Sequence, residues 1–317
     1  NRDELIESVD SSLIDKALFD MSRSGVTTVG TISSFGIDMQ ECADAKQRVV
    51  YFNEVIGSSP AAVDALFGDF KQRLNSTLEL ASESFYPAVA IHSPYAVHPV
   101  LIQAVLTLAK EKGLPTTAHF LESPAEREWL ESNSGLFKPL FEKFFNTSQA
   151  VNTIDGFLRL FNHTPTLFTH CTLAKSDEFE YMKSHNHRVI HCPRSNRLLD
   201  CGKLDIQSSP GFTLGTDGLS SNYSLSILDE LKAAVMMHSD TDLKALATML
   251  IESVTSNAAK ALNLSLGEIK EQNFADFAIF KLPDDLSYSD RATLALHTII
   301  NCDKTEGTII GGEFMEN

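Results

Sequence analysis

Positive charge is scarce in this sequence. Its 317 residues include 26 Lys and Arg against 42 Asp and Glu, which gives a net charge of −16 at pH 7 with His neutral. Because such a surface repels phosphates and anionic membranes, we expect neither nucleic acid nor a membrane among its partners. No stretch approaches the roughly 20 apolar residues of a membrane-spanning helix, and no signal-peptide pattern is present.

Cysteine is also scarce, and it is not patterned. The five cysteines stand at positions 42, 171, 192, 201 and 302, with no CxxC spacing. An odd number without a framework is typical of a reducing compartment, so we predict a cytoplasmic protein. The sequence opens on Asn1 in a helical pattern rather than on Met, and we expect a missing segment before it.

Short apolar runs alternate with amphipathic helical stretches along most of the chain. The seven strand-like runs are 26–32, 48–56, 86–91, 115–120, 166–170, 188–191 and 211–216. The helical stretches are 11–23, 60–83, 99–112, 124–162, 225–238 and 241–262. This alternation predicts an α/β fold with a parallel sheet covered on both faces. A closed (β/α)8 barrel of the TIM type needs eight strands, so we predict a barrel over 1–268 whose first strand is absent.

The last fifty residues follow a different pattern. Residues 274–281, 294–301 and 308–315 read as short strands with turns and no helices between them. We therefore predict that 269–317 forms part of a small C-terminal β-sandwich domain.

Polar side chains end five consecutive strands of the predicted barrel. They are His92, His119, His170, His191 and Asp217. A single histidine after an apolar strand is usually a structural residue, but five such ends in succession are hard to explain in that way. In barrels of this type the working residues lie at the C-terminal strand ends, so we expect an active site there.

Histidine and carboxylate are ligands that suit a divalent metal such as Zn²⁺. His119 and Asp217 are the best ligand candidates, and a bound metal would lower the pKa of a water to about 7. Glu122 lies three residues beyond His119, where it could move protons for that water. The alternative for Glu122 is a helix N-terminal acid stabilised by the helix dipole.

The His185 and His187 pair has the HxH spacing of a metal site, but we predict no such role. The two histidines precede strand 188–191, so they lie at the opposite end of the barrel. We predict that they are solvated loop residues.

The motifs at the strand ends resemble the amidohydrolase superfamily, and in particular its cytosine deaminase and chlorohydrolase-like branch. They are HSPY at 92–95, HFLE at 119–122, THC at 169–171, HCPRSN at 191–196 and LGTDGLSSN at 214–222. The segment NFADFAIF at 273–280 resembles the return into the family's β-sandwich. The resemblance implies that His119 and Asp217 bind the metal and that Glu122 carries protons.

The same resemblance implies that His170 orients the water and that His92 and His191 face the substrate. Asp217 would then act both as a ligand and as a base. The family's two remaining ligands form an HxH pair on the first strand, and no such pair precedes residue 30 here. We therefore expect the chain as written to hold one metal weakly or not at all, with zinc favoured and ferrous iron the alternative.

The segments HCPRSNRLL at 191–199 and FNEVIGSSP at 52–60 resemble members of the branch that deaminate an adenine nucleoside extended by a benzoate. An arginine binds a carboxylate through a bidentate fork, so we predict that Arg194 or Arg197 binds the benzoate. Asn196 is assigned to the same substrate site. The alternative is that these arginines form ordinary ion pairs within this acidic protein.

The sequence therefore predicts a metal-dependent hydrolytic deaminase of a small-molecule 6-aminopurine nucleoside. Rival substrates are methylthioadenosine, S-adenosylhomocysteine, guanine or a chlorinated triazine, all of which would use the same metal core. A rival of another class is a binding protein that kept the barrel without catalysis. Members of the family often pair through barrel helices, so a homodimer is a further expectation.

Overall fold

The computed structural model describes residues 10–284 and 290–315. Seven parallel strands form one sheet in the sequential order β1 to β7. The strands are β1 (Thr28–Ser33), β2 (Arg48–Val55), β3 (Phe85–Ile91), β4 (Thr116–Phe120), β5 (Thr166–His170), β6 (Arg188–His191) and β7 (Phe212–Leu214). All eight residues of β2 are buried, as expected of a parallel strand covered on both faces.

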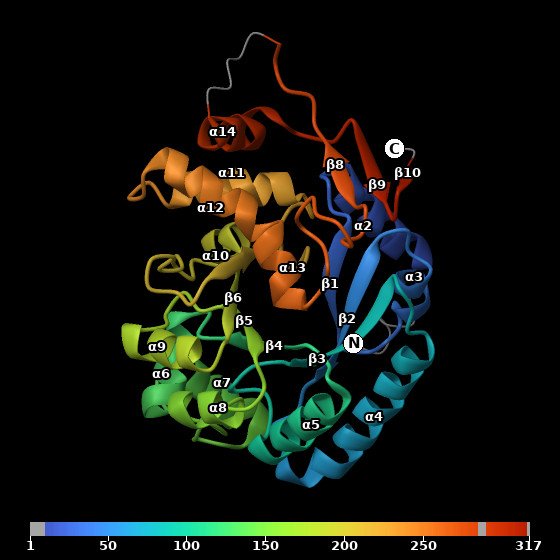
Figure 1. Cartoon of the computed structure of the whole chain (residues 1–317). Helices are drawn as coiled ribbons and strands as arrows, with labels where there is room; N and C mark the ends of the chain where they lie inside the picture. Colours follow the sequence, from blue (N-terminus) through green and yellow to red (C-terminus); the bar gives the residue numbers. More distant parts are fainter. Residues whose placement is uncertain (1–9, 285–289, 316–317) are drawn as a thin grey trace.

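Helices pack around the outside of the curled sheet (Figure 1). They are α2 (Ser11–Arg23), α3 (Met39–Ala43), η1 (Pro60–Ala62), α4 (Val63–Glu79), α5 (Pro99–Lys112), α6 (Pro124–Ser132), α7 (Phe137–Phe145), α8 (Ile154–Leu160), α9 (Ser176–Ser184), α10 (Pro193–Leu198), α11 (Ile227–Met237), α12 (Leu243–Ser253) and α13 (Ser256–Leu262). Two predicted helical stretches are thus each divided: 124–162 into three helices and 241–262 into two. The core consists of apolar side chains between the helices and the sheet. None of the described helices is long and apolar enough to cross a membrane.

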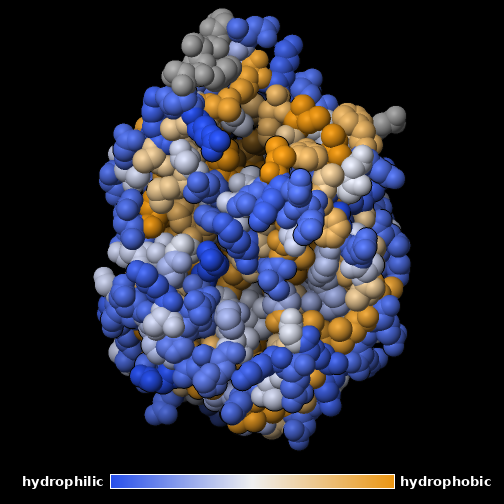
Figure 2. All heavy atoms as spheres, viewed as in Figure 1, coloured by the Kyte–Doolittle hydropathy of each residue, from blue (hydrophilic) through white to orange (hydrophobic). Residues whose placement is uncertain are grey.

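The sheet stays open between its two edge strands. Among the described residues β1 pairs only with β2 and β7 only with β6. A cavity of about 580 Å³ lies between these edges and is lined by apolar residues such as Val29, Leu214, Leu228 and Leu262. Figure 2 shows a hollow bordered by hydrophobic atoms in the upper part of the view. The seven strands in the described part of the chain form a half-barrel, which confirms the prediction of a TIM-type fold.

The C-terminal part contains a small antiparallel sheet, as predicted, but also a helix that was not. The sheet has the order β10–β9–β8, formed by β8 (Phe277–Ile279), β9 (Gly307–Ile310) and β10 (Glu313–Met315). The predicted strand at 294–301 is wrong, because α14 (Arg291–Asn301) occupies it. Asp290 caps this helix by accepting a hydrogen bond from Thr293 N, and Ile299 is fully buried. The cap and this burial outweigh the strand preference of its Thr and Ile residues.

One buried ion pair joins the tail to the sheet. Arg48, the first residue of β2, donates from Nε to Asp276 Oδ2 at 2.8 Å, and its guanidinium lies 3.7 Å from the centre of the Phe274 ring. Both side chains of the pair are almost fully buried. A domain boundary near residue 268 stays a prediction.

The two histidines of the HxH spacing, His185 and His187, lie at the amino end of the sheet, as predicted. His187 is 1% exposed, so the expectation of a solvated residue is wrong. Its Nδ1 accepts a hydrogen bond from Thr166 N at 3.1 Å, and its ring packs edge-on against Phe168. His187 is therefore a structural residue that secures the start of β5. Burial, and to a lesser degree His185, lowers its pKa to about 4.

Candidate active site

The carboxyl ends of the strands bring together two adjacent groups of metal-ligating side chains. Glu54, His92 and His119 come from the ends of β2, β3 and β4, while the second group is Glu122, His170 and Asp217. Within each group the ligand atoms all lie within 4.8 Å of one another. His119 Nδ1 is 3.3 Å from His170 Nε2, which joins the two groups into one site.

Two of the predicted residues meet in this site as neutral imidazoles. Burial, with smaller contributions from His170 and His92, lowers the pKa of His119 to about 3. Burial also lowers the pKa of His170 to about 4. Both rings are therefore uncharged at neutral pH, which is the form that binds a metal.

The two carboxyl groups of the second cluster differ in charge. Burial and the nearby Asp217 carboxylate raise the pKa of Glu122 to about 7. Burial acts to raise the pKa of Asp217 too, but hydrogen bonds from Ser195 and Ser221 outweigh it and lower the pKa. Asp217 is therefore an anion, whereas Glu122 can gain or lose a proton near neutral pH.

His170 is held by a contact that the sequence did not indicate. The Asn196 side-chain amide lies 2.9 Å from His170 Nδ1, and both side chains are buried. The other ring nitrogen, Nε2, lies 3.6 Å from Glu122 Oε1. Asn196 therefore orients a histidine of the site, and the structure shows no open surface on it for the substrate contact that we predicted.

The two histidines predicted to face the substrate lie in different surroundings. The His92 side chain is 31% exposed, and its Nδ1 lies 4.0 Å from Glu54 Oε1 without a hydrogen-bond partner. His191 is fully buried, and its Nε2 is 3.0 Å from His238 Nε2. The structure thus leaves His92 open to the site and places His191 in the interior.

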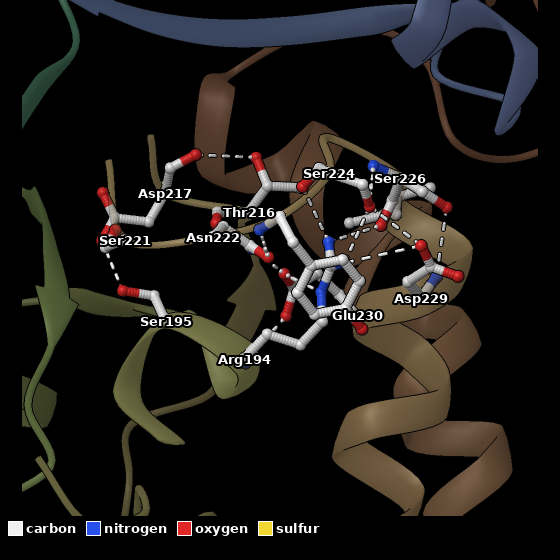
Figure 3. Close-up of polar contacts among 12 residues, drawn as sticks. Arg194, Ser195, Thr216, Asp217, Ser221, Asn222, Ser224, Ser226, Asp229 and Glu230 are labelled. Carbon is white, nitrogen blue, oxygen red and sulfur yellow. Dashed lines mark hydrogen bonds and ion pairs between the residues drawn. The ribbon is translucent and has the colours of Figure 1, made fainter. Parts of the chain in front are cut away.

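Arg194 is not available to a substrate, so the prediction for it is wrong. Its Nε donates to Glu230 Oε1 at 2.7 Å, and Nη1 donates to Ser224 Oγ at 2.8 Å and approaches Asp229 Oδ2 at 3.4 Å. Nη2 donates to the carbonyl oxygens of Ser224 and Ser226, so all five N–H groups are used (Figure 3). The internal ion pair, which was the alternative, describes Arg194.

Arg197 keeps more freedom than Arg194. Its side chain is 77% exposed, and its one ion pair lies 3.7 Å away at Asp200. Arg197 is therefore the predicted carboxylate-binding arginine that the structure leaves accessible.

Sequence reasoning missed Glu54 and His238. Glu54 stands inside an apolar strand, is 5% exposed and accepts a hydrogen bond from Ser34 Oγ. A charged residue near the end of a fully buried strand was a signal that could have identified it. His238 ends α11, 47 positions after its partner His191, and nothing local in the sequence connects them.

The donor atoms fit a divalent metal. The site offers uncharged imidazoles, an ionised carboxylate and the unpartnered Nδ1 of His92, which are nitrogen and oxygen ligands of the kind that zinc accepts. A curled parallel sheet with such groups at its strand ends defines a hydrolase barrel of the metal-dependent class.

The chain belongs to the amidohydrolase family, whose sequence model matches residues 10–315. It is 40% identical over 315 residues to an aminodeoxyfutalosine deaminase of a Nitratiruptor species, and the match covers 99% of this chain and 77% of the relative. It is 32% identical over 309 residues to an adenosine deaminase of Helicobacter pylori, and that match covers 95% of this chain and 74% of the relative.

A solved structure agrees with these relatives. The Helicobacter pylori aminofutalosine deaminase in complex with methylthio-coformycin superposes with a TM-score of 0.90 at 30% identity. The match covers 98% of this chain and 76% of that one. The prediction of a hydrolytic deaminase from this superfamily is confirmed.

Proposed function

We propose that the chain removes the 6-amino group of a purine nucleoside by hydrolysis and that aminodeoxyfutalosine is its substrate. The observation that carries the proposal is Glu122, a carboxyl group with a pKa raised to about 7 beside His170 and Asp217. The relatives that bear deaminase names support the choice of a nucleoside, and two of them support this particular one.

His119 and Asp217 would hold one divalent metal, for which zinc is our proposal and ferrous iron an alternative with the same ligand types. When bound, it would lower the pKa of a water to about 7 and so supply the nucleophile. His170, a neutral imidazole fixed by Asn196, would orient that water through Nε2.

Glu122 would move the protons of the reaction. As a carboxylate it takes a proton from the attacking water and delivers it to the ring nitrogen next to C6. Asp217, ionised before the reaction, takes the second water proton and passes it to the amino group, which leaves as ammonia. A carbonyl at C6 thus replaces the amine, with one water consumed for each ammonia released. A group with a pKa near 7 can donate and accept at the same pH, which suits this role.

Three further side chains are proposed to bind the substrate. Glu54 and the partly exposed imidazole of His92 can exchange hydrogen bonds with sugar hydroxyls or ring nitrogens. Arg197 can reach a carboxylate from its exposed position.

A substrate panel tests the proposal. The protein with added Zn²⁺ is given aminodeoxyfutalosine, methylthioadenosine, S-adenosylhomocysteine, adenosine and guanine, and ammonia release and the ultraviolet change from adenine to hypoxanthine are followed. We expect aminodeoxyfutalosine to give the highest kcat/KM. Preference for another member would keep the deaminase and discard the named substrate, and turnover of none would contradict the proposal.

We also propose that two copies of the chain pair through barrel helices. Light scattering on the purified protein gives the mass directly, and a monomer at micromolar concentration would refute this pairing.

A further inference from the structure

The loop after β7 holds Asp217 in an unusual backbone conformation. It runs from Gly215 to Ser226, the N-cap of α11. Asp217 has a φ of +57°, in the left-handed region that residues other than glycine rarely adopt. Such a conformation costs free energy, so the surrounding contacts must impose it.

The Asp217 carboxylate already accepts three hydrogen bonds from the protein. Oδ2 accepts from Ser195 Oγ at 2.6 Å and from Ser221 Oγ at 2.8 Å, and Oδ1 accepts from Gly218 N at 2.8 Å. A carboxylate offers about four lone pairs, so one on Oδ1 is left for a ligand. The orientation of the loop therefore decides where this single lone pair points.

Both ends of the loop are fixed to one buried charge, Glu230 of α11. Asn222 Nδ2 donates to Thr216 O and to Glu230 Oε1, both at 2.7 Å, and so holds the start of the loop. Arg194, also bonded to Glu230 Oε1, holds the end of the loop through the carbonyl oxygens of Ser224 and Ser226. Figure 3 shows Arg194 and Glu230 beneath this loop, with Asp217 at its far side.

Arg194 also connects the loop to α10. Its backbone N donates to Glu230 Oε2 at 3.1 Å, and the next residue, Ser195, is the one that donates to Asp217. The Tyr223 ring covers the guanidinium at 4.6 Å. Arg194 and Glu230 are 4% and 0% exposed, so this pair is buried and used entirely within the protein.

We propose that Arg194, together with Glu230 and Asn222, is a positioning clamp for the Asp217 loop: it fixes the left-handed backbone of Asp217 and directs the free lone pair of Oδ1 into the site. The proposal rests on the proposed function only in treating Asp217 as a metal ligand. It replaces the substrate role predicted for Arg194 with control over the ligand geometry.

Arg194→Lys tests the clamp while keeping a positive charge opposite Glu230. An ammonium group cannot make the planar set of five N–H contacts, so the loop should open more often. We expect hydrogen exchange at the Gly218 amide to rise about fivefold to tenfold, the equilibrium factor of one lost hydrogen bond, while exchange in β5 stays unchanged. Equal exchange at Gly218 in the variant and the parent would overturn the proposal.

Zn²⁺ alone is the second probe, measured by competition with a chromogenic chelator. We expect Arg194→Lys to weaken Zn²⁺ binding about 10-fold to 100-fold, as loss of an outer contact to a ligand does. Arg159→Lys, an exposed arginine paired with Asp155 on α8, is the matched control and should bind Zn²⁺ like the parent. Equal Zn²⁺ affinity in the parent and Arg194→Lys would refute the clamp.

Kinetics separate the clamp from a substrate-binding arginine. For the clamp, kcat falls in Arg194→Lys while KM for a carboxylate-bearing nucleoside stays constant. A rise in KM for that nucleoside alone, with unchanged loop exchange, would instead restore the substrate role.

Asn222→Ala is a second variant that leaves no unpaired charge. It removes the bonds to Thr216 O and Glu230, and should raise Gly218 exchange in the same way. If the exchange at Gly218 in Asn222→Ala equals that of the parent, the clamp is refuted, even where Arg194→Lys does not fold. Because exchange needs no turnover, an inactive substrate panel with the predicted exchange would contradict the proposed function and not the clamp.

Discussion

The two ends of the sheet use the same residue types for opposite purposes. At the amino end, Arg48 bonds to Asp276 and to Glu83 O, and His187 bonds to the backbone of Thr166. Each contact ties one element to another. At the carboxyl end, buried and partly buried histidines and carboxyl groups form two groups whose ligand atoms lie within 4.8 Å of one another, and burial together with neighbouring like groups shifts the pKa values of His119 and Glu122.

This difference separates stability from chemistry. A buried ionic group that is fully bonded gives the fold a defined geometry and resists removal. A cluster of like groups with an unpartnered nitrogen, Nδ1 of His92, has an energetic cost that a ligand can offset. We therefore expect substitutions at the amino end to lower stability, and substitutions at the carboxyl end to lower activity with little loss of stability.

Glu122→Gln is the largest expected effect. The amide keeps the size of the side chain but cannot carry a proton, so kcat should fall about 10²-fold to 10⁴-fold. The free energy of unfolding should stay the same or rise, because the change removes a buried acid beside Asp217. Ammonia release and urea unfolding measure the two quantities.

The exposed Glu131→Gln is the matched control for this substitution. It should leave kcat and stability at the parent values. If Glu122→Gln retained most of the parent kcat, Glu122 would be the helix-terminal acid that we considered as its alternative.

Arg48→Met is the next largest effect and acts at the other end. It leaves the Asp276 carboxylate buried beside Gly311 N without its cation, which should cost about 3–5 kcal/mol of unfolding free energy. Urea titration measures the loss. The kcat at low temperature should stay at the parent value, since Arg48 lies at the opposite end of the sheet from the site.

Replacing both partners gives the control. In Arg48→Met with Asp276→Leu no buried charge is left alone, so most of the lost stability should return. A double variant as unstable as Arg48→Met would show that the packing on Phe274, and not the ion pair, is what matters.

The sequence predicted those parts of the fold that local chemistry determines. Helix 99–112 was predicted to the residue, because Pro99 begins it, the His98 side chain caps Val100 N, and Gly113 ends it with a φ of +65°. The helix α14 was missed, since its burial against the rest of the protein is not visible in its own residues.

In the candidate site, too, the sequence predicted what the local pattern determines. Polarity at the strand ends identified His119, Glu122, His170 and Asp217, because strand direction alone places them at one end of the barrel. The contacts of the Arg194 side chain could not be predicted from the local pattern. Its partner Glu230 lies 36 positions away, and only the folded chain shows that Glu230 and the residues at 224–229 together use every N–H group of the guanidinium.

His187→Asn is the smallest expected effect and sharpens the comparison at the amino end. The folded pKa of His187 is lowered to about 4, below its ordinary value of 6.5. Its contribution to stability is therefore complete above pH 6.5 and is lost as the pH falls toward 4, because the unfolded chain takes up the proton first. The loss per group reaches at most about 1.4 kcal/mol per pH unit.

Asparagine can still accept the hydrogen bond from Thr166 N but does not titrate. The variant should lose stability more slowly than the parent between pH 6.5 and pH 4, whatever constant offset the smaller side chain adds. Urea unfolding across that range measures the slope, and the exposed His163→Asn serves as the matched control. Parallel curves of stability against pH for His187→Asn and the parent would mean that His187 has the same pKa in the folded and unfolded states. The amino end would then contain no buried neutral histidine, and the comparison with the cluster at the carboxyl end would fail.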